Sequence, residues 1–195
     1  MSTINNILKW LFCSAMCILL VSCSLVQKTT VNCYNYQEIM NNDGDEYTDL
    51  RCRSAILNFV ENYRTAYNRK DIDLLAKVYS DDALIYNTEK GVKQNKKKYI
   101  KYLRSVFRKN AINIKFADIK VVRHPKCPDI FGVKLLQGWN TTNYSNFGFL
   151  FLVIDFRDSV NMQIHVRTWQ QEKLNGETLS EDEIFKLGYF QITND

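Results

Sequence analysis

The chain has 195 residues, which is enough for one domain with a sizeable hydrophobic core. Its hydrophobic content of 46% and charged content of 24% are ordinary for a globular protein and exclude a chain that is disordered throughout. The formal net charge is +5. The seven glycines are spread singly along the chain, which argues against a glycine-rich loop that binds phosphates.

The first 23 residues differ in kind from the rest. Lys9 is their only charged side chain, and residues 10–21 form an apolar run of 12. This run is too short to span a membrane but suits the hydrophobic region of a signal peptide. It ends in LVSC (20–23), which resembles the lipobox of bacterial lipoproteins, where cleavage precedes the cysteine and that cysteine is lipidated. We therefore expect a signal peptide over 1–22 and acyl chains on Cys23; a plain membrane anchor or a non-lipoprotein signal is the alternative.

The residues after the predicted lipidation site indicate a cellular location. Ser24 follows Cys23, with no aspartate at that position, which resembles lipoproteins that are sent on to an outer membrane. No acidic run follows, so we predict a lipid anchor in a bacterial outer membrane with the domain facing the periplasm, and display on the cell surface as the alternative. The lipid bilayer is then the first partner, and nucleic acid is not expected at that address.

Three cysteines remain once the signal peptide and Cys23 are set aside, namely Cys33, Cys52 and Cys127. In an oxidising compartment an odd number leaves one thiol over. One pairing joins Cys33 to Cys52 and leaves Cys127 buried and free, but connectivity cannot be read from sequence. No C-x-x-C pair occurs, so neither a thioredoxin-like redox motif nor a cysteine zinc site is predicted.

Helix signals dominate the first half of the mature chain. Residues 23–48 are polar and asparagine-rich, and we interpret them as a lipidated tether. Apolar residues recur at helical spacing within 50–71, which predicts an amphipathic helix. A short helix over 71–79 follows, with Asp71 placed to cap it. A third is predicted over 95–110. The expected inner positions of the first and third helices are Ile56, Phe59, Val60, Tyr63, Tyr67, Ile100, Leu103 and Phe107.

Strand signals dominate the second half, after one short strand over 83–86. Residues 112–124 alternate, but the apolar parity changes between Phe116 and Ile119, which predicts a bulge near Ala117–Asp118. A turn over 124–129 holds both prolines of the chain. Further strands are predicted over 130–139, 147–156 and 163–170, and 179–192 is interpreted as one helical turn with a closing segment.

Helices followed by an antiparallel meander make an α+β pattern. The stretch FVENYRTAYNRKDIDLLAKVYSDDALIY (59–86) resembles the opening of the nuclear transport factor 2-like superfamily, also called the cone or ketosteroid-isomerase-like fold. Residues 144–170 resemble the sheet half of lipoproteins in this superfamily. The resemblance covers about residues 50–171. It implies a domain over 49–195 in which three N-terminal helices pack on a strongly curved antiparallel sheet, with a pocket at the open end and dimerisation through the sheet.

Strand alternation places His165, Arg167 and Trp169 on one face. We expect Phe149, Phe151, Val153 and Asp155 to share one face of the preceding strand (147–156). We expect Leu135, Gln137 and Trp139 to share one face of the strand before that (130–139). If these are the concave face, they form an aromatic floor with a few polar groups, typical of a small-molecule site. The opposite parity, with His165, Arg167 and Trp169 on an outer, docking face, stays open. The candidate ligand-binding residues are Arg167, Trp169, His165, Trp139, Gln137, Phe151 and Tyr86.

Catalytic signals are weaker. A buried arginine without an acid is costly, so Asp155 is the expected partner of Arg167. An enzyme would use Asp155 or His165 as a base, and His124 is interpreted as a turn residue. No Ser-His-Asp arrangement or metal-spaced histidine pair occurs, so no metal and no cofactor are predicted.

We therefore predict a non-catalytic module that binds a small apolar or anionic ligand or another protein. The alternative is an isomerase, cyclase or hydrolase of the cone fold that uses Asp155 and His165. A third hypothesis is a structural subunit that docks through its sheet, on itself or on another protein, and has an exposed aromatic patch. A basic helical stripe is interpreted as a solvated face or as a contact with anionic lipid headgroups. It consists of Lys97, Lys101, Arg104 and Arg108, beside Lys93, Lys96, Lys98 and Lys109.

Overall fold

The computed structural model of the chain describes residues 32–40, 49–87, 91–142, 144–174 and 177–178. The chain divides into two compact units, and the structure described below belongs to the second one, Cys33–Asp195. The predicted signal peptide, Cys23 and the closing segment 179–192 lie outside the described residues. Among the described helices, none has the length and apolar character needed to cross a membrane.

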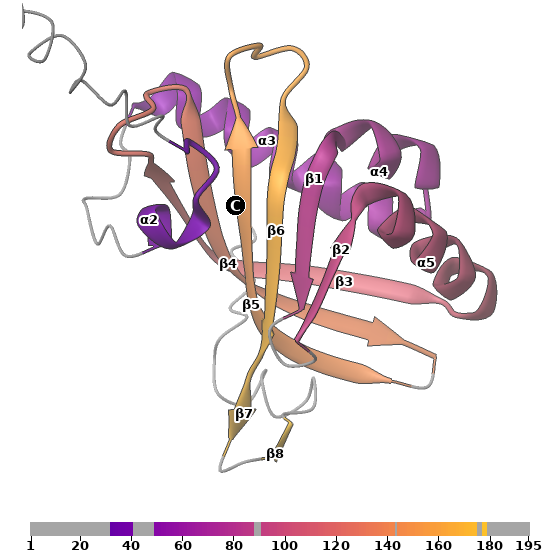
Figure 1. The fold of residues 1–195 in the computed structure, drawn as a ribbon. Helices are drawn as coiled ribbons and strands as arrows, with labels where there is room; N and C mark the ends of the chain where they lie inside the picture. The colour runs from indigo at the N-terminus through magenta and orange to yellow at the C-terminus, as the bar shows by residue number, and fades with distance from the viewer. Residues whose placement is uncertain (1–31, 41–48, 88–90, 143, 175–176, 179–195) are drawn as a thin grey trace, which may run out of the picture. The chain divides into compact units, whose positions relative to one another are not determined.

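Three helices pack on one side of the sheet (Figure 1). They are α3 (Leu50–Asn68), α4 (Ile72–Val78) and α5 (Lys96–Lys109). Each begins at a side chain that accepts hydrogen bonds from free backbone N–H groups of the first turn: Asp49, Asp71 and Asn95. The predicted cap at Asp71 is confirmed. All eight predicted inner positions of α3 and α5 are buried, so the helical periodicity located the core correctly.

The sheet has six strands in the order β2-β1-β6-β5-β4-β3. Their bounds are β1 (Tyr79–Asn87), β2 (Val92–Asn95), β3 (Ile112–Arg123), β4 (Ile130–Thr141), β5 (Ser145–Asp155) and β6 (Gln163–Gln171). Neighbours are antiparallel except β1 and β6, which run parallel. The predicted α+β class with three helices on a sheet is confirmed, but the sheet is mixed rather than wholly antiparallel. A separate ribbon joins β7 (Lys173–Leu174) and β8 (Glu177–Thr178).

Two bulges change which way side chains point. In β3 the register shifts between Ala117 and Lys120, and Asp118 takes a positive φ of 48°, so the predicted bulge is confirmed. In β6, Val166 pairs with Val153 and Ile164 pairs with Ile154, which leaves His165 without a counterpart. A residue inserted in this way reverses the alternation of the strand.

The sheet therefore has two differently covered faces, which we call the inner face (toward α3, α4 and α5) and the outer face. The inner core includes Ile164 and Trp169 from β6. The outer face carries the short helix α2 (Tyr36–Met40) (Figure 1). A smaller buried cluster there includes Ile39 of α2 and Val166 of β6. The buried members of the outer cluster are Ile39, Cys127, Ile130, Phe151, Val153 and Val166.

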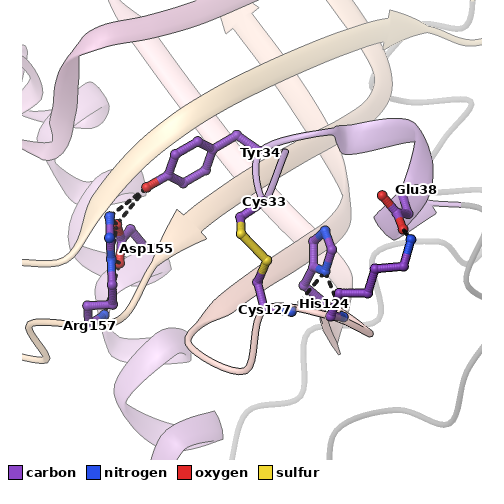
Figure 2. The surroundings of a disulfide bond; sticks show 8 residues. Cys33, Tyr34, Glu38, His124, Cys127, Asp155 and Arg157 are labelled. Carbon is purple, nitrogen blue, oxygen red and sulfur yellow. Dashed lines mark hydrogen bonds and ion pairs between the residues drawn. A yellow bond between two sulfur atoms is a disulfide. The ribbon is translucent and has the colours of Figure 1, made fainter. Parts of the chain in front are cut away.

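A disulfide between Cys33 and Cys127 ties the α2 segment to the sheet (Figure 2). The pairing of Cys33 with Cys52 is wrong, since Cys52 is the free thiol and Cys127 is bonded. Lys126 also pairs with Glu38 of α2. Residues 33–40 were assigned to the tether because they are polar, yet the compact unit begins at Cys33 rather than at residue 49.

Candidate functional site

A cavity of about 450 Å³ lies on the inner face, between α5 and strands of the sheet. Its described lining combines aromatic rings, aliphatic groups, side-chain amides and one charged group, which is Arg167. The lining residues are Ile85, Tyr86, Asn87, Val92, Gln94, Tyr99, Tyr102, Val106, Asn110, Gln137, Trp139, Thr141, Tyr144, Asn146, Arg167, Trp169 and Gln171.

Five of the seven candidate ligand-binding residues line this cavity: Arg167, Trp169, Trp139, Gln137 and Tyr86. They come from three strands, β1, β4 and β6, which are far apart in sequence and belong to the same sheet. Whether they contact a ligand stays a prediction. The other two candidates, His165 and Phe151, lie elsewhere.

His165 lies outside the cavity because of the bulge in β6. The insertion turns its side chain away from the face that carries Arg167 and Trp169, so the predicted three-residue row is wrong at its first member. Phe151 fails for a different reason. It pairs with Lys134 and Thr168 and packs in the outer cluster, whereas its neighbours Leu150 and Leu152 belong to the inner core. The predicted grouping of Phe151 with Gln137 and Trp139 assumed the wrong parity between neighbouring strands.

Arg167 has an unusual environment for a buried cation. It is only 6% exposed, and its Nε donates a hydrogen bond to the Tyr63 hydroxyl at 3.2 Å. Its guanidinium carbon lies 5.3 Å from the centroid of the Tyr99 ring. Among the described residues, no carboxylate forms an ion pair with it. The expected partner, Asp155, is engaged on the outer face, so that expectation is wrong.

Arg167 adjoins a cluster of four buried tyrosine hydroxyls, contributed by α3, β1 and α5. Tyr63 bonds Tyr79 at 2.7 Å, and Tyr67 bonds Tyr99 at 2.6 Å. Longer contacts of 3.3 Å and 3.4 Å join Tyr67 to Tyr63 and to Tyr79. We call these residues the tyrosine cluster.

The electrostatics of the tyrosine cluster follow from its burial. Burial raises the pKa of Tyr67 and of Tyr79 well above the usual value, and raises the pKa of Tyr99 to about 12. These hydroxyls are therefore neutral at physiological pH. Burial acts to lower the pKa of Arg167, but the surrounding phenol oxygens raise it, and the net direction is well above the usual value. The cluster thus holds a permanent cation without neutralising it.

Two side-chain amides, Gln137 of β4 and Asn146 of β5, add polar groups to the lining of the cavity. Asn146 is buried, and its Nδ2 donates to the Tyr144 hydroxyl at 2.9 Å. Its Oδ1 is fully enclosed and has no hydrogen-bond partner among the described residues. Gln137 is only 2% exposed. Tyr102 and Tyr144 are about half exposed, at 54% and 52%, and lie where the cavity lining meets solvent.

The outer face carries a second polar group, which we call the outer cluster of charges. Tyr34 donates its hydroxyl to Asp155 at 2.9 Å, and its ring stacks on His165 with the centroids 4.0 Å apart. His165 Nδ1 lies 3.3 Å from Asp82 Oδ1, and its Nε2 lies 3.6 Å from Asp155 Oδ2. Arg157 donates to both oxygens of Asp155 (Figure 2).

The titration of the outer cluster of charges reflects this pairing. Burial raises the pKa of Asp155, but hydrogen bonds from Arg157 and Tyr34 outweigh it and bring the pKa down to about 2. Burial lowers the pKa of His165 below 6.5, although Asp82 and Asp155 oppose that shift. Asp155 is therefore an engaged carboxylate and not an available base.

His124 behaves as the turn residue that the sequence suggested. Its Nδ1 accepts from the backbone N–H groups of Lys126 and Cys127, at 3.0 Å and 3.2 Å. No group of three or more metal-binding side chains with suitable spacing occurs in the described part of the chain.

The tyrosine cluster and Asn146 were missed in the sequence. Tyr63 and Tyr67 were assigned to the core stripe of α3, and no role was assigned to their hydroxyls. The available signal was tyrosine rather than phenylalanine at buried helical positions, because a buried phenol needs a partner. Asn146 lies in β5 but one residue before the predicted strand 147–156, and it gave no comparable signal.

Comparisons with known proteins agree with this geometry. Residues 56–144 match the family model described as the SnoaL-like domain. An NTF2-like protein of unknown function from Pseudomonas putida KT2440 superposes with a TM-score of 0.57 at 13% identity, covering 69% of this chain and 98% of that one. Residues 56–144 are therefore similar to the SnoaL-like domain, and the described structure has the NTF2-like fold that the resemblance in the sequence implied.

Two further solved structures show the same fold at low identity. Bd1075 from Bdellovibrio bacteriovorus gives a TM-score of 0.53 at 19% identity, covering 62% of this chain but only 41% of that protein's length. A candidate aromatic ring hydroxylase from Novosphingobium aromaticivorans gives 0.55 at 15% identity, covering 70% of this chain and 98% of that one. No curated protein matches the chain in sequence.

Proposed function

We propose that the protein is a non-catalytic, lipid-anchored binding protein whose domain holds a small, partly apolar ligand in the inner-face cavity. The observation that carries this proposal is Arg167, a cation buried in the cavity wall, which bonds the Tyr63 hydroxyl and forms no ion pair with a carboxylate among the described residues. An unpaired buried charge costs several kcal/mol of folding stability, on the order of 3–5 kcal/mol when one partner of a buried pair is missing. A ligand that supplies the missing negative charge offsets that cost.

The rest of the lining supports the same proposal. Trp139, Trp169 and Tyr99 offer flat apolar surface, and Gln137 and Asn146 offer hydrogen bonds. An apolar cavity with a few convergent polar groups is the usual composition of a small-molecule site. Domains of this fold bind small ligands and are often enzymes, so the fold alone does not separate binding from catalysis.

An enzyme that uses Asp155 and His165 is the alternative. The short distances of His165 to Asp82 and Asp155 favour it, since carboxylates that orient a histidine are common in acid–base sites. However, neither residue lines the cavity, and the ring of Tyr34 stacks on His165. We therefore rank binding at Arg167 first.

Docking through the outer face is less well supported. That hypothesis required an exposed aromatic patch, whereas Phe151, Val153 and Val166 are buried in the cluster that includes Ile39 of α2. A homodimer or a protein partner that used this part of the sheet would have to displace α2.

The anchor is proposed on the LVSC sequence and the oxidised Cys33–Cys127 pair, which suits a compartment outside the cytoplasm. We propose an outer membrane location with the domain in the periplasm. Labelling cells with a radioactive fatty acid tests this, because Cys23→Ser should abolish incorporation and release the protein from the membrane fraction. Retention of the label in Cys23→Ser would refute the proposed anchor.

The binding proposal is tested by a thermal-shift screen of the full chain in detergent against a library of metabolites and lipid fragments. A ligand at a hundred times its dissociation constant adds about 2.7 kcal/mol of stability. Its signal should disappear in Arg167→Ala and persist in Arg157→Ala, a matched change on the outer face. A hit that survives Arg167→Ala would place binding elsewhere.

A further inference from the structure

The cations of α5 and its N-terminal approach form a surface that the proposed binding function does not use. Between residues 91 and 110 the sequence holds eight lysines and arginines and no acidic residue. Their charge exceeds the net charge of the whole chain, +5, so the rest of the chain is net acidic. Charge of one sign gathered on one segment attracts partners of the opposite sign. We call these residues the basic patch: Lys93, Lys96, Lys97, Lys98, Lys101, Arg104, Arg108 and Lys109.

The basic patch faces solvent and is largely unneutralised. All of its members except Lys96 are exposed. Lys96 is also the only member that forms an ion pair with a described residue, Asp81, at 2.7 Å. The opposite side of α5 is buried through Ile100 and Leu103, so packing of the helix on the domain fixes the cations outward. Because α5 has 14 residues, these cations extend along roughly 20 Å of surface.

The mouth of the inner-face cavity lies beside the basic patch. Six large hydrophobic side chains are exposed among the described residues, and three of them line the cavity. We call these three the rim: Val92, Tyr102 and Tyr144. Tyr102 belongs to α5, and Lys98 precedes it by four residues, which places both on the same side of the helix. Lys93 follows Val92 in β2, which lies beside α5 (Figure 1).

Exposed cations around exposed tyrosines suit the surface of a bilayer. A tyrosine ring has an apolar body and a polar hydroxyl, so it is stable at the level of the lipid headgroups. Lysine and arginine lay their methylene stems along apolar surface while their charges contact anionic headgroups. A bilayer therefore matches the rim and the basic patch together, whereas a soluble polyanion matches the cations alone.

We propose that the basic patch and the rim dock on the surface of an anionic lipid bilayer, so that the cavity opens toward the membrane. The rim continues inward, because the Tyr102 ring stacks on Tyr99 with the centroids 6.3 Å apart, and Arg167 lies 5.3 Å from the centroid of the Tyr99 ring. An apolar ligand can then pass between bilayer and cavity without crossing water. This inference goes beyond the proposed binding function, since docking does not require an occupied cavity.

Partition onto vesicles tests the charges. The full-length Cys23→Ser protein, which lacks the proposed lipidation site, is mixed with vesicles of phosphatidylcholine or of an equal mixture of phosphatidylcholine and phosphatidylglycerol. The bound fraction is measured by cosedimentation, and the apolar run 10–21 is present with both kinds of vesicle. Binding should be at least about tenfold tighter to the anionic vesicles, because each basic residue near such a surface contributes up to about fivefold. This preference should weaken at high salt.

Matched variants assign the preference to the basic patch. In the full-length Cys23→Ser protein, replacing Lys98, Lys101 and Lys109 by glutamine should reduce the preference for anionic vesicles by at least about tenfold. The control replaces three exposed lysines outside α5 by glutamine and should leave most of the preference intact. The control positions are Lys77, Lys120 and Lys134. Circular dichroism confirms that both triple variants are folded.

Fluorescence quenching tests which way the cavity faces. In anionic vesicles with brominated acyl chains, Tyr102→Trp should show more quenching than the wild-type tryptophans alone, because the new indole lies at the membrane surface. Val160→Trp introduces an indole at another exposed apolar position, which does not line the cavity, and should add no quenching.

Three results would overturn the proposal. An anionic preference that is absent, or that persists in the patch variant, would remove the role of the basic patch. Quenching of Tyr102→Trp that does not exceed that of Val160→Trp would show that the cavity does not open toward the membrane. Binding of polyglutamate without any preference for anionic vesicles would assign the patch to an acidic protein segment. The ligand screen of the cavity is independent of all three results.

Discussion

The two faces of the sheet treat charge in opposite ways. On the outer face Asp155 meets Arg157, Tyr34 and His165 within hydrogen-bond or ion-pair distance, and the Tyr34 ring stacks on His165. On the inner face Arg167 is more deeply buried than Arg157, yet its described neighbours are neutral phenols and indole rings. The charges of the outer face are matched within the chain. Arg167, which no described carboxylate matches, lies in a cavity where a ligand can match it.

The first prediction removes the covalent support of the outer face. Replacing Cys33 and Cys127 by serine opens a loop with a sequence separation of 94. The chain-entropy model then gives a loss of about 4.6 kcal/mol in the free energy of unfolding. Denaturant titration of the double variant measures it. Binding at the inner-face cavity should survive where the protein is folded. A loss under about 1 kcal/mol would mean that noncovalent contacts, such as the packing of Ile39 and the pair of Glu38 with Lys126, are enough to hold α2.

The second prediction concerns the pH dependence of the outer face. The pKa of Asp155 is about 2 in the folded protein, below its ordinary value of 3.8, so its ionised form favours folding. This contribution, about 2 kcal/mol, is complete above about pH 4 and is lost as the pH falls toward 2. Wild type should therefore exceed Asp155→Asn in stability at pH 6, and the difference should vanish near pH 2. A constant difference across that range would contradict the assigned pairing.

The third prediction applies to Arg167, where the comparison between the faces is sharpest. If its charge is unmatched without ligand, Arg167→Met should change the free energy of unfolding by less than about 1 kcal/mol or raise it. Truncating one partner of a matched buried pair would cost about 3–5 kcal/mol instead. Denaturant titration without ligand measures the change. A loss in that higher range would show that Arg167 is a structural residue.

The fourth prediction has the smallest effect and concerns His165. Because burial lowers its pKa below 6.5, the neutral form favours folding, and its stabilising contribution is lost as the pH falls below that value. NMR titration of the imidazole signals measures the pKa, and His165→Gln assigns the signal. Asp82→Asn removes an opposing influence and should lower the pKa of His165 further. An upward shift in that variant would contradict the contact.

Much of the fold could be predicted because its signals are local. The N-cap at Asp71 and the apolar stripes of α3 and α5 depend on residues that are close in sequence. The change of apolar parity that marks the bulge in β3 is equally local. The parallel pairing of β1 with β6 joins segments about 80 residues apart, and no local pattern encodes it. The short strand β2, VKQN, is polar and exposed and lacks a strand signal.

The candidate site was predictable only as far as alternation within one strand allowed. Alternation placed Arg167 and Trp169 together correctly, but the bulge at His165 has no signature in IHVRTWQQ comparable with the parity change in β3. The choice of Phe151 failed because alternation does not say which parity of one strand shares a face with the next. The partner of Asp155 was missed although Arg157 is only two residues away, since burial made Arg167 the more demanding cation.

The disulfide also fixes where a change in redox state would act on the domain. Cys33 and Cys127 pack with the outer cluster, and neither lines the cavity. A thiol–disulfide exchange at this pair would remove the covalent tie between the α2 segment and the sheet, and it would act on the face of the sheet opposite Arg167.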